Sequence, residues 1–485
     1  MPTTPFFPPW RPTLAPMGQS LTKSIHQIRL CTLSQLESRF SSCLPASAFT
    51  KAPRGPNSRN RLYTQGRTFW CFLWQCLQVN AAGREVVRQF QALLALLGAA
   101  PICSDDGAYC TARQRLPQSL LTTALQTSAA VCERSAARSG FLQDRTIKVV
   151  DGTSATLPDT PQNQREYPQV STMKAGCSFP LVKIVAVFSL LSGAIVAAAC
   201  GSINTSEFRL LYDLLACLHP QDILIADRGF GNAPIVAWLQ SLKVDFISRS
   251  ARKIDGRRRR RRLGKNDWLV SWKRKHSAVI PPELQASLPT QLTIRIVRGS
   301  LYQRGFRVRQ VTLVTTLLDV GLYPAADILQ AYLRRWRMEM CLDDLKTTLG
   351  MNTLSCKSPE MVRKELLMHL IAHNLVRYTM IQAAVEHGAE LQRISFKGTL
   401  DALRQFTHAM AQARSKDKRQ ELWECLLRTL VADLVPLRPN RREPRAVKQR
   451  SRKYDRLLVP RWQYEDRPKR NTRRARSRLR RIALS

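Results

Sequence analysis

The sequence predicts an α/β fold in which a mixed β-sheet is flanked by helices. Three observations lead to this prediction. Apolar residues make up 44% and aromatic residues 7% of the 485-residue chain, as in a globular protein. Short runs of β-branched residues alternate with segments of helical periodicity. Between residues 146 and 248 these segments follow the order β-β-β-α-β-α-β, which is typical of a mixed sheet, and we expect its helices on one face.

The N-terminal region of the chain is predicted to be a leader followed by helices. Residues 1–20 are rich in proline and lack the continuous apolar segment of a secretory signal, so we expect residues 1–60 to be flexible. From residue 61 to residue 143, apolar side chains such as Phe69, Phe72 and Leu73 recur at spacings of three and four, which indicates helices.

The predicted strands begin at Thr146 and include the longest apolar run of the chain. That run, residues 184–200, has 17 residues and is interrupted by Ser192 and Gly193, so it is slightly short for a membrane-spanning helix. Two strands joined at the Leu-Ser-Gly turn fit its β-branched and small residues better. Two further strands are expected at residues 222–226 and 244–248.

The charge of the chain indicates a polyanionic partner. It has 76 basic and 35 acidic residues, a net charge of +41, and nucleic acid is the commonest polyanion for so basic a protein. Residues 251–320 hold 17 basic and 4 acidic residues, and residues 436–485 hold 19 and 4, so these two segments supply 13 plus 15, or 28, of the net charge. Either segment could instead be a solvated surface or a localisation tail. Thirteen cysteines without a C-x-x-C pair indicate free thiols in a reducing cytoplasm.

Two aspartates occupy positions typical of a catalytic edge. Asp151 and Asp227 each follow a run of β-forming residues and precede a glycine or an Arg-Gly pair, so we expect both at the C-terminal ends of strands. Neighbouring carboxylates repel each other unless a cation lies between them, and hard oxygen ligands select Mg²⁺ or Mn²⁺. The alternative is that both are ordinary turn residues and that Asp227 pairs with Arg228.

A third carboxylate lies on a predicted helix, residues 325–349. At about 100° per residue, Tyr332, Arg335, Glu339 and Lys346 fall within about 60° of one another on the helix wheel. A carboxylate that completes a metal site and cations that bind phosphate oxygens are what phosphodiester chemistry requires. The alternative is a surface helix on which Arg335 and Glu339 form an ion pair four residues apart.

These residues resemble a known family. The pattern from Tyr332 to Lys346 is similar to the Y-R-E-K signature of the DDE transposases of bacterial insertion sequences, in the branch named after insertion sequence four. The resemblance runs from about residue 105 to residue 445 and implies a ribonuclease-H-like core, a mixed sheet flanked by helices, interrupted by a β-rich insertion. The other similar blocks, in the same order, are Tyr109 to Pro117, Asp151-Gly152-Thr153, Thr160 to Gln169 and Ala226 to Phe230.

The resemblance implies metal-dependent cleavage of DNA at transposon ends and strand transfer into target DNA. The implied partners are double-stranded DNA, as terminal inverted repeats and as target, and a second copy in a homodimeric synaptic complex, without a membrane. The implied location is the bacterial cytoplasm, at the nucleoid. The implied catalytic and metal-binding residues, for two Mg²⁺ or Mn²⁺ ions, are Asp151, Asp227 and Glu339; the phosphate-binding residues are Tyr332, Arg335, Lys346 and Arg228.

Two other functions remain open at this point: a metal-dependent nuclease that cuts without joining, and a transposase-derived DNA-binding protein without activity. The expected domain division is a leader (1–60), a helical DNA-binding domain (61–143), a first segment of the catalytic core (144–250), a basic β-rich insertion (251–320), a second segment of the catalytic core (321–390), a helical region (391–435) and a basic tail (436–485).

Two residue pairs have less specific patterns. Trp268 and Trp272, in the basic insertion, could stack on a flipped base or could belong to a small core. His369 and His373 have the i, i+4 spacing of zinc ligands, but no third ligand of matching pattern lies nearby, so we expect them on a helix that packs on the core.

Overall fold

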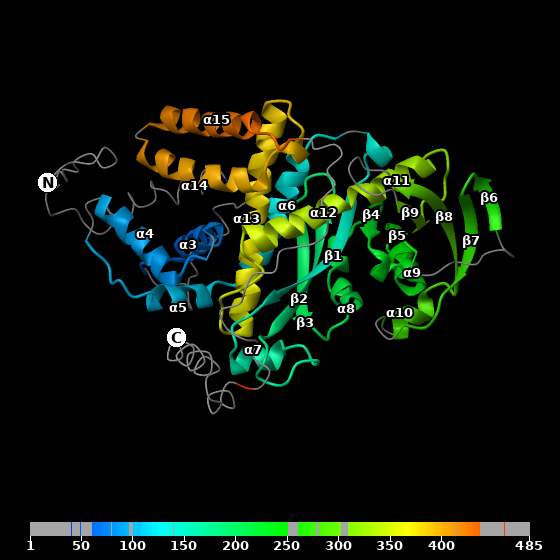
Figure 1. The fold of residues 1–485 in the computed structure, drawn as a ribbon, viewed down its shortest axis with the longest axis horizontal. Helices are drawn as coiled ribbons and strands as arrows, with labels where there is room; N and C mark the ends of the chain where they lie inside the picture. The colour runs from blue at the N-terminus through cyan, green and yellow to red at the C-terminus, as the bar shows by residue number, and fades with distance from the viewer. Residues whose placement is uncertain are drawn as a thin grey trace, which may run out of the picture.

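The computed structural model describes residues 61–436 except 79, 97–99, 139, 251–259, 278–279, 281, 302–308 and 414, and also residues 40, 49 and 460 (Figure 1). Nearly all of the predicted leader, almost the whole basic tail and the first three arginines of the run 257–262 therefore lie outside the described residues.

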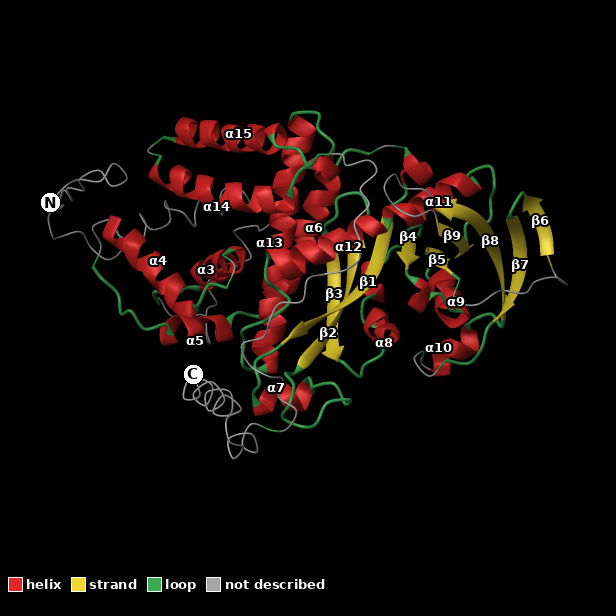
Figure 2. Cartoon of the chain, viewed as in Figure 1, coloured by secondary structure: helices red, strands yellow, loops and turns green. Residues whose placement is uncertain are grey.

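One sheet of nine strands organises the described region of the chain (Figure 2). The strand order is β3-β2-β1-β4-β5-β9-β8-β7-β6. The strands are β1 (Ile147–Thr156), β2 (Leu181–Ser189), β3 (Ile195–Ser202), β4 (Ile223–Ala226), β5 (Asp245–Arg249), β6 (Arg260–Gly264), β7 (Asp267–Lys273), β8 (Gln291–Leu301) and β9 (Arg309–Thr315).

The sheet is mixed, as predicted. β1, β4 and β5 are parallel, whereas β2, β3 and the four strands from β6 to β9 pair in antiparallel fashion. The long apolar run forms β2 and β3, joined by a turn in which Gly193 has φ +73°, so the prediction of two strands is confirmed. β9 pairs with both β5 and β8, so the basic strands extend this same sheet at its β5 edge.

Helices cover both faces of the sheet, so the prediction of a single helical face is wrong. Side chains alternate along the strands: Val149 and Ile225 belong to one core, and Val150 and Leu224 to the other. The first core is covered by α6 (Gln118–Ser135), α11 (Ala325–Arg334), α12 (Trp336–Asp343) and α13 (Pro359–Glu386). The second is covered by α8 (Glu207–Tyr212) and α9 (Ala233–Ser241). The helices of the first face come from outside residues 146–248, which is why the local order of elements did not reveal them.

Five further helices, α3, α4, α5, α14 and α15, lie towards the end of the molecule opposite β6 and β7 (Figure 1). The predicted helical character of residues 61–143 is confirmed, and α3, α4 and α5 share a small core of their own around Tyr63, Phe90 and Tyr109. α14 and α15 follow the long helix α13. The bounds are α3 (Gln65–Leu77), α4 (Gly83–Leu96), α5 (Gly107–Arg115), α7 (Pro161–Glu166), α10 (Pro282–Ser287), α14 (Phe396–Gln412) and α15 (Lys416–Ala432).

The helix predicted for residues 325–349 exists but is interrupted. α11 ends at Arg334 and α12 begins at Trp336; the Arg335 N–H donates to the Tyr332 carbonyl at 3.2 Å, which is an i to i−3 bond that tightens the chain there. After α12, a π-helical turn (η5) covers Asp344–Thr348. Helical periodicity alone cannot show such local changes of hydrogen bonding.

The side chains with less specific sequence patterns lie in cores. Trp268 and Trp272, on β7, pack against the second core, with Arg298 5.2 Å above the Trp268 ring. His369 and His373 are both buried in α13, where His373 stacks on Phe396 with ring centroids 5.1 Å apart. None of the described helices combines the length and apolarity that crossing a bilayer requires.

Candidate active site

The register of β1 and β4 places the two aspartates side by side. The last parallel pair of these strands is Val150 with Ala226, so Asp151 and Asp227 are the next residues on each strand. We expected Asp151 to stand at the end of its strand. It does not, because β1 continues to Thr156 in antiparallel pairing with β2. The expectation was wrong on this point because β1 has two neighbours, and only its pairing with β4 ends at Val150.

The third carboxylate comes from α12, on the face of the sheet that carries Asp151. Asp151 shares a side of β1 with Val149, whose core is covered by α11 and α12. Arg335, between these helices, donates from Nη2 to Glu339 Oε1 at 2.8 Å and from Nη1 to Asp151 Oδ2 at 3.4 Å. The Tyr332 hydroxyl donates to Asp227 Oδ1 at 3.3 Å. Five of the seven predicted site residues are therefore in one contact network.

The electrostatics of the site show how close the carboxylates are. Burial raises the pKa of Asp151, and the charges of Glu339 and Asp227 raise it further, although the Gly152 N–H and Arg335 act in the opposite direction. Burial likewise raises the pKa of Tyr332 to about 12, so its hydroxyl stays protonated at neutral pH and remains a donor. A carboxylate surrounded by others in this way favours a cationic partner.

The site residues differ in their solvent exposure: some are buried in the protein and others lie at its surface. The side chain of Arg335 is 7% exposed and that of Asp151 19%, whereas that of Glu339 is 53% exposed. Asp227 and Arg228 are also exposed, at the start of η4 (Arg228–Phe230). The guanidinium of Arg335 therefore lies at the bottom of a site that opens to solvent along Asp227 and Glu339.

Arg228 and Lys346 are the two predicted residues that are not among these five, and Lys346 lies apart on η5. It lies half-buried on the π-helical turn, and within the described chain no ion pair joins it to any of the three carboxylates. The wheel that grouped it with Glu339 assumed a regular helix, whereas the turn at Asp344–Thr348 has different periodicity.

Sequence reasoning missed a fourth carboxylate beside the site, Glu207, in the first turn of α8. A Cβ on Gly152 would stand 2.8 Å from Glu207 Oε1, and a Cβ on Gly229 would stand 3.9 Å from Oε2. The carboxylate of Glu207 therefore spans the two glycines that follow Asp151 and Asp227. The order β3-α8-β4 was predictable, but only the fold places the start of α8 next to these glycines.

Sequence reasoning also missed a clamp on the loop that follows the π-helical turn. The buried Glu365 carboxylate accepts hydrogen bonds from the Ser355 N–H at 3.0 Å, the Ser355 hydroxyl at 2.6 Å and the Cys356 N–H at 2.9 Å. Asn163, in the block that begins at Thr160, donates to the Cys356 carbonyl at 3.2 Å. Through Asn163 this block therefore helps to hold in place the segment between α12 and α13.

A divalent cation fits the donor chemistry of the site. All three predicted ligands are carboxylates from adjacent elements, and hard oxygen donors suit Mg²⁺ and Mn²⁺. Among the described residues, however, no trio of His, Cys, Asp or Glu side chains forms a ready-made metal site. In this structure the Arg335 guanidinium lies between Asp151 and Glu339 and forms an ion pair with each.

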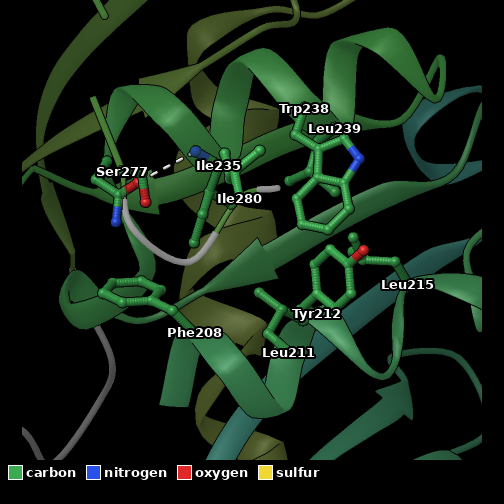
Figure 3. Close-up of a pocket in the computed structure, with 10 residues that line it drawn as sticks. Phe208, Leu211, Tyr212, Leu215, Ile235, Trp238, Leu239, Ser277 and Ile280 are labelled. Carbon is green, nitrogen blue, oxygen red and sulfur yellow. Dashed lines mark hydrogen bonds between the residues drawn. The ribbon is translucent and has the colours of Figure 1, made fainter. Parts of the chain in front are cut away.

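A hollow next to the site has a different character (Figure 3). It is lined mainly by apolar and aromatic side chains of α8 and α9, with the Tyr212 and Trp238 rings 4.6 Å apart. Phe208, which directly follows Glu207, forms one wall and contacts Phe230 edge to face. Because the lining contains none of the three carboxylates, we describe the hollow as packing between α8 and α9.

Comparisons with known proteins identify a matching family model and similar proteins. Residues 142–375 match the family model described as the transposase DDE domain, and this range contains all three carboxylates. The transposase InsG for insertion sequence element IS4 of Escherichia coli (strain K12) is 27% identical over 390 residues, which cover 79% of this chain and 85% of that protein. Among solved structures, a synaptic complex of piggyBac transposase with hairpin DNA aligns with a TM-score of 0.37 at 10% identity, over 83% of this chain and 85% of that one.

Proposed function

The chain belongs to the DDE transposases, of the type found in insertion sequence four, and from this premise we propose that it cuts DNA at transposon ends and joins the freed ends to target DNA. In this proposal Asp151, Asp227 and Glu339 are the catalytic carboxylates. The observation that carries it is the contact network in which Arg335 joins Asp151 and Glu339, while the β1–β4 register brings Asp227 beside Asp151.

DDE transposases generally use divalent metal ions, and we assign two Mg²⁺ or Mn²⁺ ions to these three carboxylates. Bound there, the ions would activate a water or a 3′-hydroxyl as nucleophile and stabilise the leaving oxygen. Glu207 lies next to Gly152 and Gly229, on the face of the sheet that α8 covers, whereas Asp151 and Glu339 lie on the other face.

The polar residues around the carboxylates would hold the DNA backbone. Arg335 and Tyr332 contact the carboxylates through groups that can also donate to phosphate oxygens, and a guanidinium suits a phosphate because its donors form a planar fork. Arg228 is exposed next to Asp227 and would bind a phosphate at the rim. Lys346 would bind a phosphate further along the DNA, since it lies on the turn that follows α12.

Strand order supports a ribonuclease-H-like core within the larger sheet. The five strands β3-β2-β1-β4-β5 form a mixed unit, and β6 to β9 continue it between Asp227 and Glu339, where the insertion is expected. The domain division expected from the sequence belongs to this proposal, with the helices of residues 61–143 as the DNA-binding domain. If two transposon ends are cut together, two copies of the protein are needed, so we propose a homodimeric synaptic complex. Because the substrate is DNA and the family is bacterial, we propose that the protein acts at the nucleoid, in the cytoplasm.

The proposal is tested by separate nicking and strand-transfer assays on DNA that carries the flanking sequences of the gene. We expect Asp151→Asn, Asp227→Asn and Glu339→Gln each to lower the rate of Mg²⁺-dependent nicking by at least about 100-fold, because each removes a charge from the metal site. Glu421→Gln, an exposed glutamate on α15, is the matched control and should nick at the wild-type rate.

The two assays also separate joining from cutting. With a pre-cleaved 3′-hydroxyl end and a supercoiled target, we expect joined product that disappears on chelation of Mg²⁺. Cleavage without any joined product would show a nuclease instead of a complete transposase. Undiminished nicking by the three carboxylate variants would show that the site assignment is wrong.

A further inference from the structure

A group of three arginines lies on the side of α12 that faces away from the carboxylates. At about 100° per residue, Arg337 and Glu339 are about 160° apart around the helix axis, on opposite flanks of the buried stripe that contains Met338 and Leu342. Arg334 ends α11, one turn before Arg337. Arg377, on α13, completes the group, which we call the Arg334–Arg337–Arg377 cluster.

Two of the three side chains, those of Arg334 and Arg377, are held in place by contacts with uncharged groups. The Arg334 guanidinium lies 3.8 Å from the centroid of the Phe141 ring. Arg377 donates to the Ser192 carbonyl from Nε at 2.9 Å and from Nη2 at 2.6 Å. Arg337 is half-buried, and within the described chain its side chain has neither a hydrogen bond nor an ion pair. A partly desolvated guanidinium without a partner is unfavourable in the free protein.

Neighbouring charges make the cluster more unfavourable still. Burial lowers the pKa of Arg337, and Arg334 and Arg377 lower it further, while Glu390 opposes them. Glu390 is exposed and forms no ion pair in the described chain. Two other acids lie nearby. Asp327 acts on Arg334, and Asp344 has its pKa raised to about 7 by burial although Arg377 opposes the shift. The three guanidinium groups thus have three acids near them, but in the described chain none of these acids forms an ion pair with the cluster.

We propose that the Arg334–Arg337–Arg377 cluster binds phosphate groups of the DNA backbone. The proposal rests on the proposed function in one respect, that the substrate is DNA, and it adds a second contact on the far side of α12. An oxyanion would satisfy the unpaired guanidinium of Arg337, and planar guanidinium donors match phosphate oxygens in pairs. Lone surface lysines would offer neither the fixed geometry nor the partial desolvation.

The position of the cluster suits a duplex that is already seated at the carboxylates. A helix with its side chains is about 10–12 Å across, so the two flanks of α12 are separated by about that distance. Duplex DNA carries one charge per about 1.7 Å of its axis, so further phosphates of the same duplex lie within this reach. The cluster would thus hold the DNA against α12 while the carboxylates act on the scissile bond.

The test measures DNA affinity as a function of salt, with a fluorescent duplex of arbitrary sequence and with EDTA present. We expect Arg337→Gln to weaken binding by about 5- to 10-fold and to reduce the slope of log K against log salt by about 0.9, the value for one phosphate contact. Arg428→Gln is the matched control, because it removes an equal charge from an exposed position of α15. Equal effects of the two variants would overturn the proposal.

A stability measurement separates this role from a structural one. Since Arg337 has no partner in the described chain, Arg337→Gln should keep or raise the melting temperature, whereas a fall of several degrees would indicate a structural role and overturn the proposal. Inorganic phosphate, tested alone, distinguishes the source of the anion. Suppose that phosphate raises the melting temperature of the wild type but not of Arg337→Gln, and that the salt slope of DNA binding is the same for both proteins. The site would then bind a free anion, and the DNA assignment would be overturned.

These measurements do not depend on catalysis. Binding is compared in EDTA, where the metal-dependent reaction does not run, so wild-type protein that fails to nick in Mg²⁺ would contradict the proposed function and leave the binding comparison intact. Conversely, the wild-type protein could nick DNA while Arg337→Gln loses no more DNA affinity than the Arg428→Gln control. That result would contradict only the proposal for the arginine cluster.

Discussion

Arg295 links the basic strands to the helix that carries the site, and replacing it tests that link. It lies on β8 with no exposed side-chain surface. It donates to Asp267 on β7 from Nε at 2.9 Å and from Nη2 at 2.6 Å. Its Nη1 donates to the Leu317 and Tyr323 carbonyls, at 3.2 and 2.7 Å, in the segment that leads into α11.

The contacts of Arg295 allow the size of the effect to be estimated. Asp267 is only 4% exposed, so Arg295→Met leaves a buried carboxylate without a partner, and solvent does not screen it. Breaking a buried ion pair by removing one partner costs about 3–5 kcal/mol. At about 2–4 °C per kcal/mol for a unit of this size, the melting temperature should fall by about 6–20 °C. Arg295→Met with Asp267→Leu should recover most of this loss, because both charges are then absent.

Thermal unfolding and urea unfolding, followed by circular dichroism, measure both variants. Arg298→Met is the control, because Arg298 is on the same strand but exposed. It should change the free energy of unfolding by less than about 1 kcal/mol. If Arg295→Met stays within about 1 kcal/mol of the wild type, or if the double variant is no better than the single one, the reasoning from the buried pair is refuted.

Three further predictions concern other buried or crowded groups. Burial lowers the pKa of His373 to about 3. As the pH falls from 6.5 towards 3, the unfolded chain therefore takes up a proton that the folded chain does not, and the free energy of unfolding falls by about 1.4 kcal/mol per pH unit. His373→Phe should remove this part of the pH dependence in urea unfolding at pH 7.5 and 5; equal pH dependence would contradict it. Gly152→Ala puts a Cβ 2.8 Å from Glu207 Oε1, so it should slow nicking in the wild type but have little further effect in a Glu207→Ala background; additive losses would contradict the contact. Glu365→Gln weakens the clamp on Ser355 and should lower the free energy of urea unfolding by about 1.5–3 kcal/mol, and no change would show that the clamp is not stabilising.

Much of the site followed from local pattern. The place of Asp227 at the end of β4 was predictable because a run of β-forming residues before a polar residue marks a strand end, but the same rule failed for Asp151, since β1 continues to Thr156. Arg335 and Glu339 were predictable as neighbours because residues four apart on a helix share a face. The same rule failed for Lys346, since it assumes one regular helix and the chain changes to a π-helical turn at Asp344.

Other features depended on contacts between segments that are far apart in the sequence. Glu207 is 55 residues after Gly152, and nothing in either local pattern shows that α8 begins against that glycine. The second helical face has the same origin, because α11 and α13 return to the sheet from beyond the basic strands. The pairing of β9 with β5, which makes the basic strands belong to the central sheet, is likewise a long-range choice.

The amino-acid sequence by itself determined most elements, the net positive charge and the choice of three carboxylates as candidates, because these depend on periodicity, composition and neighbours a few residues apart. Tertiary structure alone decided which side of each strand met which helix and where Arg335 was buried between Asp151 and Glu339. It also decided that Arg337, on α12, has no hydrogen bond or ion pair in the described chain. Those outcomes depend on burial and on the register of distant segments, and a desolvated charge acquires its energetic significance only after the chain has folded around it.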